Sequence, residues 1–390
     1  MAPSLTNPVL TAGLRQYLDV LRDGDEDDRA LARVGLVLLR DLAVRLTVAN
    51  TARALDYVLA PRFRQVQVRA PVFVVAPPRS GTTLLYGMLA ADPRFLGPRL
   101  YETLLPSVSA LRLTEGISAL AQRLTGAAVD EGFTRWEQER FGPTDSIHRV
   151  RHRELEEDTL LFDRHFASPS ALRFFPRGAE LAPLTMLDDQ PPETRRAVMG
   201  AYYRAIQRLL YHAGPPRQTY LAKNVHSAGR IGSLLQRFPD ARFVHIVRNP
   251  YAVIPSAVRM FRVSNYLGID GASRPTMPLG HPVWSVFADL VIDSYRRLLR
   301  WEQRVPQSQW VTLRFESLIA DPLAAAERLY DRFEIPMTEP ARAAMAKVAD
   351  GASRYRSSDG PAPQLEDCGL TREGVYKRLS EVFEAYGFER

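Results

Sequence analysis

Cysteine, lysine and long apolar runs are all scarce in this chain. It has one cysteine, Cys368, in 390 residues, which excludes an internal disulfide and a cysteine-rich metal site. The longest apolar candidate, residues 34–39, falls far short of the ~18–20 residues that cross a membrane. Residues 1–4 lack the charged and apolar regions of a secretory signal. These absences predict a cytoplasmic enzyme without a transmembrane segment.

Lysine supplies only three of the 51 basic residues, at Lys223, Lys347 and Lys377. Arginine therefore carries nearly all of the net charge of +7, and a genome biased toward arginine codons explains this balance without an acidic partner. No basic run with interleaved aromatic residues occurs, so nucleic-acid binding is not predicted. A small polyanionic ligand accounts equally well for a local cluster of positive charge.

The most informative segment is 72–83, Val-Phe-Val-Val-Ala-Pro-Pro-Arg-Ser-Gly-Thr-Thr. Its apolar first half predicts a buried strand, and apolar residues recur at helical spacing over 84–89. A loop between a strand and a helix offers a phosphate free backbone N–H groups and the positive end of the helix dipole. Gly81 permits close backbone approach, and Thr82 and Thr83 add hydroxyl donors. No lysine follows the glycine, so this is not a Walker A loop.

The rest of the pattern predicts an α/β fold. Strands are expected at 72–76, 220–222, 242–247 and 310–315, and helices at 231–237, 322–333 and 372–386. This alternation implies a parallel sheet covered on both faces. Apolar residues at three- and four-residue steps predict a helical N-terminal segment, 1–66, that packs on a main domain, 67–390. A helical insert at about 104–215 is expected within that domain.

A second candidate site follows the strand at 242–247. Arg248 comes directly after it, and Ser256 lies eight residues on in the expected helix. Ligands of open parallel sheets bind at the carboxyl ends of strands, so Arg248 and Arg79 should face one crevice. An arginine and a hydroxyl hold a phosphate through charge-assisted hydrogen bonds. Two such anion-binding positions at one edge of the sheet, the loop at 79–83 and Arg248 with Ser256, predict a ligand with two separate phosphates.

These motifs resemble those of the sulfotransferases that use 3′-phosphoadenosine 5′-phosphosulfate (PAPS). The similarity lies in Pro-Pro-Arg-Ser-Gly-Thr-Thr after a strand and in Arg-Asn-Pro with a serine eight residues beyond its arginine. The arginine form of the loop is similar to bacterial sulfotransferase-family proteins and protein-tyrosine sulfotransferases. The resemblance extends over about 70–340 and includes Ala-Asp-Pro at 91–93 and Phe-Pro-Asp-Ala at 238–241. It implies a three-layer α/β/α fold with a central parallel sheet, related to P-loop kinases.

The resemblance also implies roles for particular residues. The cofactor-binding set would be Arg79, Ser80, Gly81, Thr82, Thr83, Arg248 and Ser256. In the family, residues matching 80–83 bind the 5′-phosphosulfate and those matching Arg248 and Ser256 bind the 3′-phosphate. Arg79 would reach the sulfuryl group, and Lys223 matches a lysine that neutralises charge on the transferring group. PAPS would be the donor and 3′-phosphoadenosine 5′-phosphate (PAP) the product.

Glu102 matches the position of the family's catalytic carboxylate. The acceptor hydroxyl loses its proton as sulfur is attacked, and a carboxylate in a partly desolvated cleft can take it. Two alternatives stay open: a carboxylate of the acidic run 154–158, which also fits a solvated or capping segment, and His226, which also fits a structural role. Arg354 and Arg356 fit either closure over the nucleotide or a solvated loop.

Some features depart from the family pattern. Phe315 stands where related enzymes often carry tyrosine, and Lys-Asn-Val-His at 223–226 only loosely matches the Lys-Thr-His signature of cytosolic members. No metal site is predicted, because His148 and His152 form only a weak pair without a glutamate. The rivals to sulfotransfer are a P-loop-type kinase, which needs a lysine after the loop glycine and a magnesium carboxylate, and a nucleotide-binding module without this activity.

The predicted reaction moves a sulfuryl group from PAPS to an acceptor hydroxyl by in-line displacement. The expected acceptor is a small-molecule or lipid-like alcohol or phenol, or a glycoside; no oligomeric state is predicted. Aromatic residues of the insert suit such an acceptor and equally suit a core. They are Phe133, Trp136, Phe141, Phe162, Phe166, Phe174 and Phe175.

Overall fold

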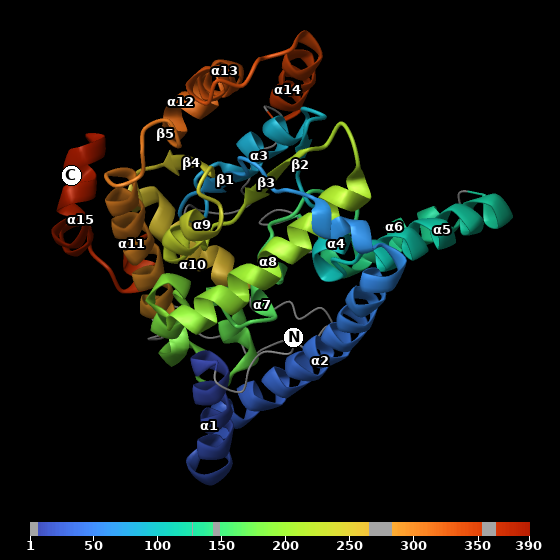
Figure 1. Ribbon diagram of the computed structural model, residues 1–390. Coiled ribbons are helices and arrows are strands. Elements are labelled where there is room, and N and C mark those ends of the chain that lie inside the picture. Colours follow the sequence, from blue (N-terminus) through green and yellow to red (C-terminus); the bar gives the residue numbers. More distant parts are fainter. Residues whose placement is uncertain (1–6, 127, 143–148, 265–282, 353–363) are drawn as a thin grey trace.

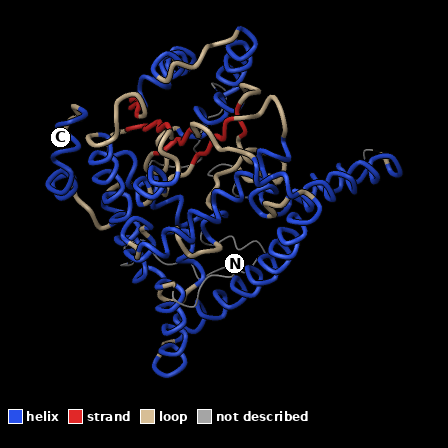
Figure 2. The backbone as a smooth tube through the Cα atoms, in the orientation of Figure 1, coloured by secondary structure: helices blue, strands red, loops and turns tan. Residues whose placement is uncertain are grey.

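Short apolar strands form a parallel sheet at the centre of the molecule, surrounded by helices (Figures 1 and 2). The computed structural model describes residues 7–126, 128–142, 149–264, 283–352 and 364–390. The strands are β1 (Val72–Val75), β2 (Phe95–Leu96), β3 (Thr219–Lys223), β4 (Arg242–Val247) and β5 (Trp310–Arg314). Their spatial order is β2-β3-β1-β4-β5, and every neighbouring pair is parallel. The predicted parallel α/β fold is confirmed.

Helices cover the sheet and extend well beyond it (Figure 1). They are α1 (Pro8–Asp23), α2 (Glu26–Leu59), α3 (Thr82–Ala90), α4 (Leu100–Leu104), α5 (Val108–Thr125), α6 (Ala128–Phe141), α7 (Leu160–Asp163), α8 (Pro192–Ala213), α9 (Ile231–Arg237), α10 (Pro250–Ser264), α11 (Val283–Glu302), α12 (Phe315–Ala320), α13 (Pro322–Arg332), α14 (Glu339–Ala352) and α15 (Arg372–Tyr386). The helices expected at 231–237 and 372–386 have the predicted ends. Within the insert expected to be helical, short 3₁₀ turns occupy much of the chain between α7 and α8. Among the helices of the described residues, none is both long and apolar enough to span a membrane.

Side chains of β1 alternate between two apolar clusters. Phe73 and Val75 pack in one cluster with residues of α8 and α9. Val72 and Val74 pack in the other with residues of α3, α13 and α14. Successive side chains of a strand point to opposite faces of its sheet, so the two clusters are the two covered faces. The layers are therefore α/β/α, and the carboxyl ends of β1, β3 and β4 meet at one edge.

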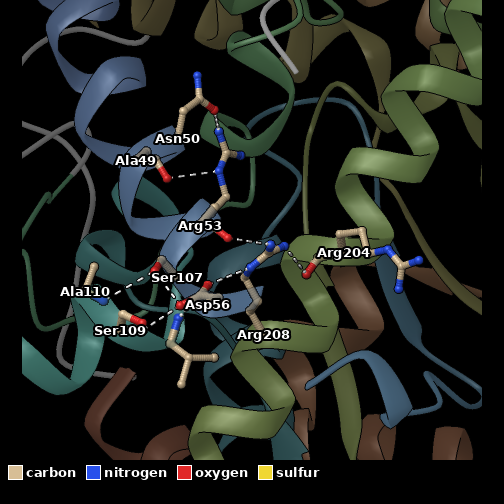
Figure 3. Close-up of polar contacts among 10 residues, drawn as sticks. Ala49, Asn50, Arg53, Asp56, Ser107, Ser109, Ala110, Arg204 and Arg208 are labelled. Carbon is tan, nitrogen blue, oxygen red and sulfur yellow. Dashed lines mark hydrogen bonds and ion pairs between the residues drawn. The ribbon is translucent and has the colours of Figure 1, made fainter. Parts of the chain in front are cut away.

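The long helix α2 is fixed to the rest of the molecule by a buried charged cluster, which we call the Asp56 node (Figure 3). The Asp56 carboxylate accepts hydrogen bonds from Arg208 Nε on α8 at 2.7 Å and from Ser107 Oγ at 3.0 Å. It also accepts from the backbone N–H groups of Val108 at 3.2 Å and Ser109 at 2.8 Å. One carboxylate thereby joins α2, the first turn of α5, and α8.

Candidate functional site

The loop between β1 and α3 has the features of an anion-binding site. Arg79 and Gly81 both have positive φ, at 67° and 83°. Gly81 is the N-cap of α3, and within the described residues no side chain caps this N-terminus. The buried Ser80 hydroxyl has no hydrogen-bond partner in the same part of the chain. The loop therefore offers backbone and hydroxyl donors at the positive end of a helix dipole.

Gly81 is required by its surroundings. A side chain there would be strained by the positive φ, and its Cβ would lie 2.9 Å from the Phe315 ring. Phe315 thus packs directly against the loop between β1 and α3. The sequence marked this residue only as a departure from the family pattern; its contact with the loop depends on the tertiary structure.

Arg248, at the end of β4, reaches the same loop. Its Nη1 donates a hydrogen bond to the Arg79 carbonyl oxygen at 2.8 Å, and its guanidinium carbon lies 4.1 Å from the centroid of the Phe315 ring. Arg79 Nε in turn donates to Ser256 Oγ on α10 at 3.2 Å. The structure therefore connects the loop at 79–83 with Arg248 and Ser256, which are far from it in the sequence, through hydrogen bonds.

Arg248 forms no ion pair with a carboxylate of the described residues. Burial lowers the pKa of its guanidinium, and Tyr295 and the more distant Glu316 carboxylate partly oppose this shift. Its carbonyl oxygen accepts a hydrogen bond from Tyr295 OH at 2.6 Å, which fixes the backbone at this strand end. A partly buried cation whose hydrogen bond goes to a neutral carbonyl oxygen favours an anionic ligand beside it.

Lys223 lies on the other side of the loop, as the last residue of β3 and in register with Val74 of β1. The side chain is almost fully buried. Its Nζ lies 3.1 Å from Glu157 Oε1 and donates a hydrogen bond to Thr83 Oγ1 at 3.4 Å. The structure therefore places this lysine beside Thr83 of the loop between β1 and α3.

Glu102 lies in the first turn of α4 and is 8% exposed. Its Oε2 accepts a hydrogen bond from the Arg99 N–H at 2.6 Å, whereas Oε1 has no hydrogen-bond partner in the described part of the chain. Burial raises the pKa of this carboxyl, and the positive groups that partly oppose the rise are Arg99, His212 and Arg217. Glu102 therefore combines a free carboxylate oxygen with increased basicity.

The acidic run 154–158 divides into members with different surroundings. Glu154 is exposed, in agreement with a solvated segment. Asp158 is buried, accepts a hydrogen bond from Asn224 Nδ2 at 2.7 Å, and has its pKa raised by desolvation. Glu157 is the member that pairs with the lysine of β3. The interpretation of the whole run as a solvated segment is therefore wrong for Asp158 and Glu157.

His226 lies close to the site but is a weak base. Burial lowers the pKa of its imidazole to about 4. The ring stacks on Phe261, with the centroids 6.1 Å apart, and lines a small cavity of about 10 Å³ together with Pro78. A group with this pKa takes up a proton poorly at neutral pH. The positions of Arg354 and Arg356 lie outside the described residues.

Most aromatic residues of the insert are part of the core. Buried members are Phe162, Phe166, Phe174 and Phe175. By contrast, Phe133 and Trp136 are partly exposed and stack on each other beside His152. His152 Nδ1 lies 2.7 Å from Glu137 Oε1, and His148 lies outside the described residues. The described part of the chain contains no group of three or more His, Cys, Asp or Glu residues that could hold a metal ion.

Comparison with known proteins identifies the family. A model of the sulfotransferase family matches residues 71–339, which is most of the chain and includes the loop, Lys223, Arg248 and Ser256. The chain belongs to the sulfotransferase family. It is therefore a sulfotransferase enzyme, and the rival prediction of a P-loop-type kinase is not favoured.

Relatives of this sulfotransferase are found in mycobacteria. The omega-hydroxy-beta-dihydromenaquinone-9 sulfotransferases Stf3 of Mycobacterium bovis and Mycobacterium tuberculosis are 27% identical over 322 residues, which cover 82% of this chain and 76% of each relative. The solved sulfotransferase STF9 of Mycobacterium avium has a TM-score of 0.66 at 19% identity, over 96% of this chain and 97% of its own. STF1 of Mycobacterium tuberculosis has a TM-score of 0.60 at 21% identity, over 97% and 99%. These structures share the P-loop-like sulfotransferase fold with this chain.

Proposed function

We propose that this enzyme transfers the sulfuryl group of PAPS to the hydroxyl of a lipid-like alcohol or phenol, in the cytoplasm. The observation that carries the proposal is the connected group of Arg79, Ser256 and Arg248 around the N-terminus of α3, which no side chain of the described residues caps. A nucleotide with phosphates at its 3′ and 5′ positions suits two anion-binding positions that lie this close together. The Ser80 hydroxyl, which has no hydrogen-bond partner among the described residues, and the constrained Gly81 fit the same ligand.

Different residues would bind the two phosphates of the nucleotide. Residues 80–83 and the first N–H groups of α3 would hold the 5′-phosphate, and Arg248 with Ser256 would hold the 3′-phosphate. When bound, PAPS supplies an activated sulfuryl group whose leaving group is PAP. Arg79 and Lys223 would stabilise the negative charge that develops at the point of transfer.

We assign Glu102 as the general base that accepts the hydroxyl proton of the acceptor. Its Oε1 is free of other hydrogen bonds within the described residues, and burial raises the pKa of the carboxyl toward the range in which bases work well. Glu157 would instead orient Lys223, because its carboxylate is already engaged by that ammonium. A carboxylate in an ion pair holds protons less well than an unpaired one.

The acceptor class rests on a relative. Stf3 is named as a sulfotransferase of omega-hydroxy-beta-dihydromenaquinone-9, a lipid-like molecule with a hydroxyl. We propose a hydroxyl of similar character for this chain, without assigning the individual molecule.

A two-step experiment tests the function. Thermal unfolding is first measured with PAP and with ATP–magnesium; PAP should raise the midpoint because it binds the folded state, and ATP–magnesium should raise it less. The enzyme is then incubated with PAPS and a set of lipid-like alcohols and phenols, and the products are analysed by mass spectrometry for a sulfate adduct. Stabilisation by ATP–magnesium alone, without PAP, would contradict the nucleotide assignment.

A further inference from the structure

A cleft of about 730 Å³ lies between α2 and α8. From α8 it is lined by a face that includes Ala197, Ala201, Arg204 and Arg208, spaced as successive turns of a helix. The opposite face of α8 packs on the sheet. None of the predicted nucleotide-binding residues lines the cleft. It is therefore a separate concavity, within the ~300–1,000 Å³ typical of ligand sites.

The lining of the cleft is strongly positive. It includes Arg53, Arg196, Arg204 and Arg208, and none of the described lining residues is acidic. Arg208 is paired with Asp56 of the node behind it. For the other three arginines, no carboxylate of the described residues lies within ion-pair distance. The cleft therefore has a surplus of positive charge that an anion would balance.

Arg53 shows the effect of this surplus most clearly. Figure 3 shows its guanidinium bonded to the neighbouring Ala49 and Asn50 of the same helix. Burial and the nearby Arg208 guanidinium lower the pKa of Arg53 to about 10. Both hydrogen-bond partners are neutral, and the nearby Asp56 carboxylate is paired with Arg208 rather than with Arg53. A pre-positioned guanidinium of this kind binds carboxylate, phosphate or sulfate groups well.

A second, independent feature borders the same cleft. His165 is 8% exposed, and its buried Nε2 has no hydrogen-bond partner among the described residues. Burial lowers the pKa of the ring to about 4, so the imidazole is neutral at neutral pH and Nε2 can donate or accept according to its tautomer. Buried polar atoms without partners are rare and call for an explanation. A polar group of a bound molecule would supply the missing partner.

The α8 wall leaves room for an apolar body. Gly200 lies in the middle of this helix and lines the cleft, and a Cβ added there would meet no atom within 4 Å. Glycine is less favourable than alanine at such a position, and no described neighbour requires it. Together with Ala197 and Ala201 it lines the cleft with small residues, and Tyr57 of α2 lines it as well.

We propose that this cleft binds an amphipathic anion, a molecule with an apolar body and a single carboxylate, phosphate or sulfate headgroup. Arg53 would take the headgroup, and the small residues of α8 with Tyr57 would contact the apolar body. Because the cleft shares no residue with the nucleotide site, this proposal does not rest on the proposed function.

The test is calorimetric titration of the full-length protein with three probes: octyl sulfate, octanol and inorganic sulfate. Each titration is run with and without saturating PAP, so that anion binding at the nucleotide site is counted separately. Octyl sulfate should bind with one-to-one stoichiometry in both conditions. Octanol and inorganic sulfate should each bind at least about tenfold more weakly. Octanol lacks the anionic headgroup, and inorganic sulfate lacks the apolar body.

Two variants locate the binding. Arg53→Gln should weaken octyl sulfate about tenfold or more, and Gly200→Leu should abolish its binding by filling the cleft. The matched controls are Arg123→Gln and Gly116→Leu on α5, where the arginine is exposed and a Cβ at the glycine meets open space; both should bind as the wild type does. Thermal unfolding of all four variants checks that each is folded.

Four results would overturn the proposal: no saturable binding of octyl sulfate, unchanged binding in Arg53→Gln and Gly200→Leu, equal affinity for inorganic sulfate, or equal affinity for octanol. If PAP itself fails to bind, the proposed function fails, while the titrations without nucleotide still decide the cleft.

Discussion

In the Asp56 node a buried carboxylate meets a buried guanidinium, and the carboxylate accepts four hydrogen bonds. At the proposed nucleotide site the partly buried cations are held differently: Arg248 donates to the carbonyl oxygen of Arg79, and Arg79 donates to the hydroxyl of Ser256. The charges of the Asp56 node are therefore paired with each other, and no ligand is needed to balance them. The partners of Arg248 at the site position its charge but do not neutralise it.

This difference separates stability from function. A saturated charged cluster joins elements, and removing one partner leaves the other buried and unpaired. A cation held by neutral donors and acceptors retains its attraction for an anion. Substitutions in the node should therefore change unfolding and leave nucleotide binding intact. Substitution of the cations at the proposed site should instead weaken nucleotide binding and change unfolding little.

The largest effect is expected for the base. Glu102→Gln should lower kcat by about 10²–10⁴-fold, while PAP binding measured by calorimetry stays within a few-fold of wild type. Because burial raises the pKa of Glu102 above its ordinary value of 4.5, wild-type activity should fall as the pH drops through a midpoint above 4.5. The substitution should remove that acidic limb of the pH–rate profile.

Glu157→Gln is the matched control for this prediction. It removes the partner of Lys223 and should lower kcat less than Glu102→Gln does, with the acidic limb retained. The opposite result, near-normal turnover of Glu102→Gln and a large loss in Glu157→Gln, would move the base to Glu157.

Breaking the Asp56 node should have the next largest effect. Arg208→Met leaves a fully buried carboxylate without its cation and should lower the free energy of unfolding by about 3–5 kcal/mol. Urea unfolding measures this change. The exposed pair of Arg40 and Asp41 on the same helix provides the control, since Arg40→Gln should cost at most about 1 kcal/mol. A loss of PAP affinity in folded Arg208→Met would show that the two regions are coupled.

At the nucleotide site, Arg248→Gln should weaken PAP by about 10- to 150-fold, the worth of a hydrogen bond to a charged group. Adenosine 5′-phosphosulfate lacks the 3′-phosphate, so its affinity should hardly change. Arg314→Gln, at the end of the adjacent strand and partly exposed, should leave both affinities unchanged. Equal losses for the two nucleotides would contradict the assignment of Arg248 to the 3′-phosphate.

The smallest effects are expected on the free energy of unfolding when either of two glycines is replaced by alanine. Gly200→Ala should raise the free energy of unfolding by about 0.5–1 kcal/mol, because alanine favours the helix and its methyl group meets open space. Gly81→Ala should instead lower it by about 1–3 kcal/mol, since φ is +83° and Phe315 occupies the space. Thermal and urea unfolding of both variants check the opposite signs.

Local patterns in the sequence predicted much of the fold. The strand at 242–247 and the helices at 231–237 and 372–386 have the expected ends, because apolar periodicity and flanking turn residues act over a few positions. The same is true of the phosphate loop, where one glycine between a strand and a helix determines the local geometry. The long N-terminal helical stretch was predicted as well, although the break between α1 and α2 was not.

What joins these elements was decided by the tertiary structure. Arg79 meets Ser256 across 177 positions, and Lys223 meets Glu157 through a contact that the acidic run did not reveal. Asp56 gave no signal in the sequence, because its partners come from α5 and α8. The sequence by itself determined which segments become strands, helices and the phosphate loop. The pairing of buried charges depends on which distant side chains the packed layers bring together, and no local periodicity encodes that.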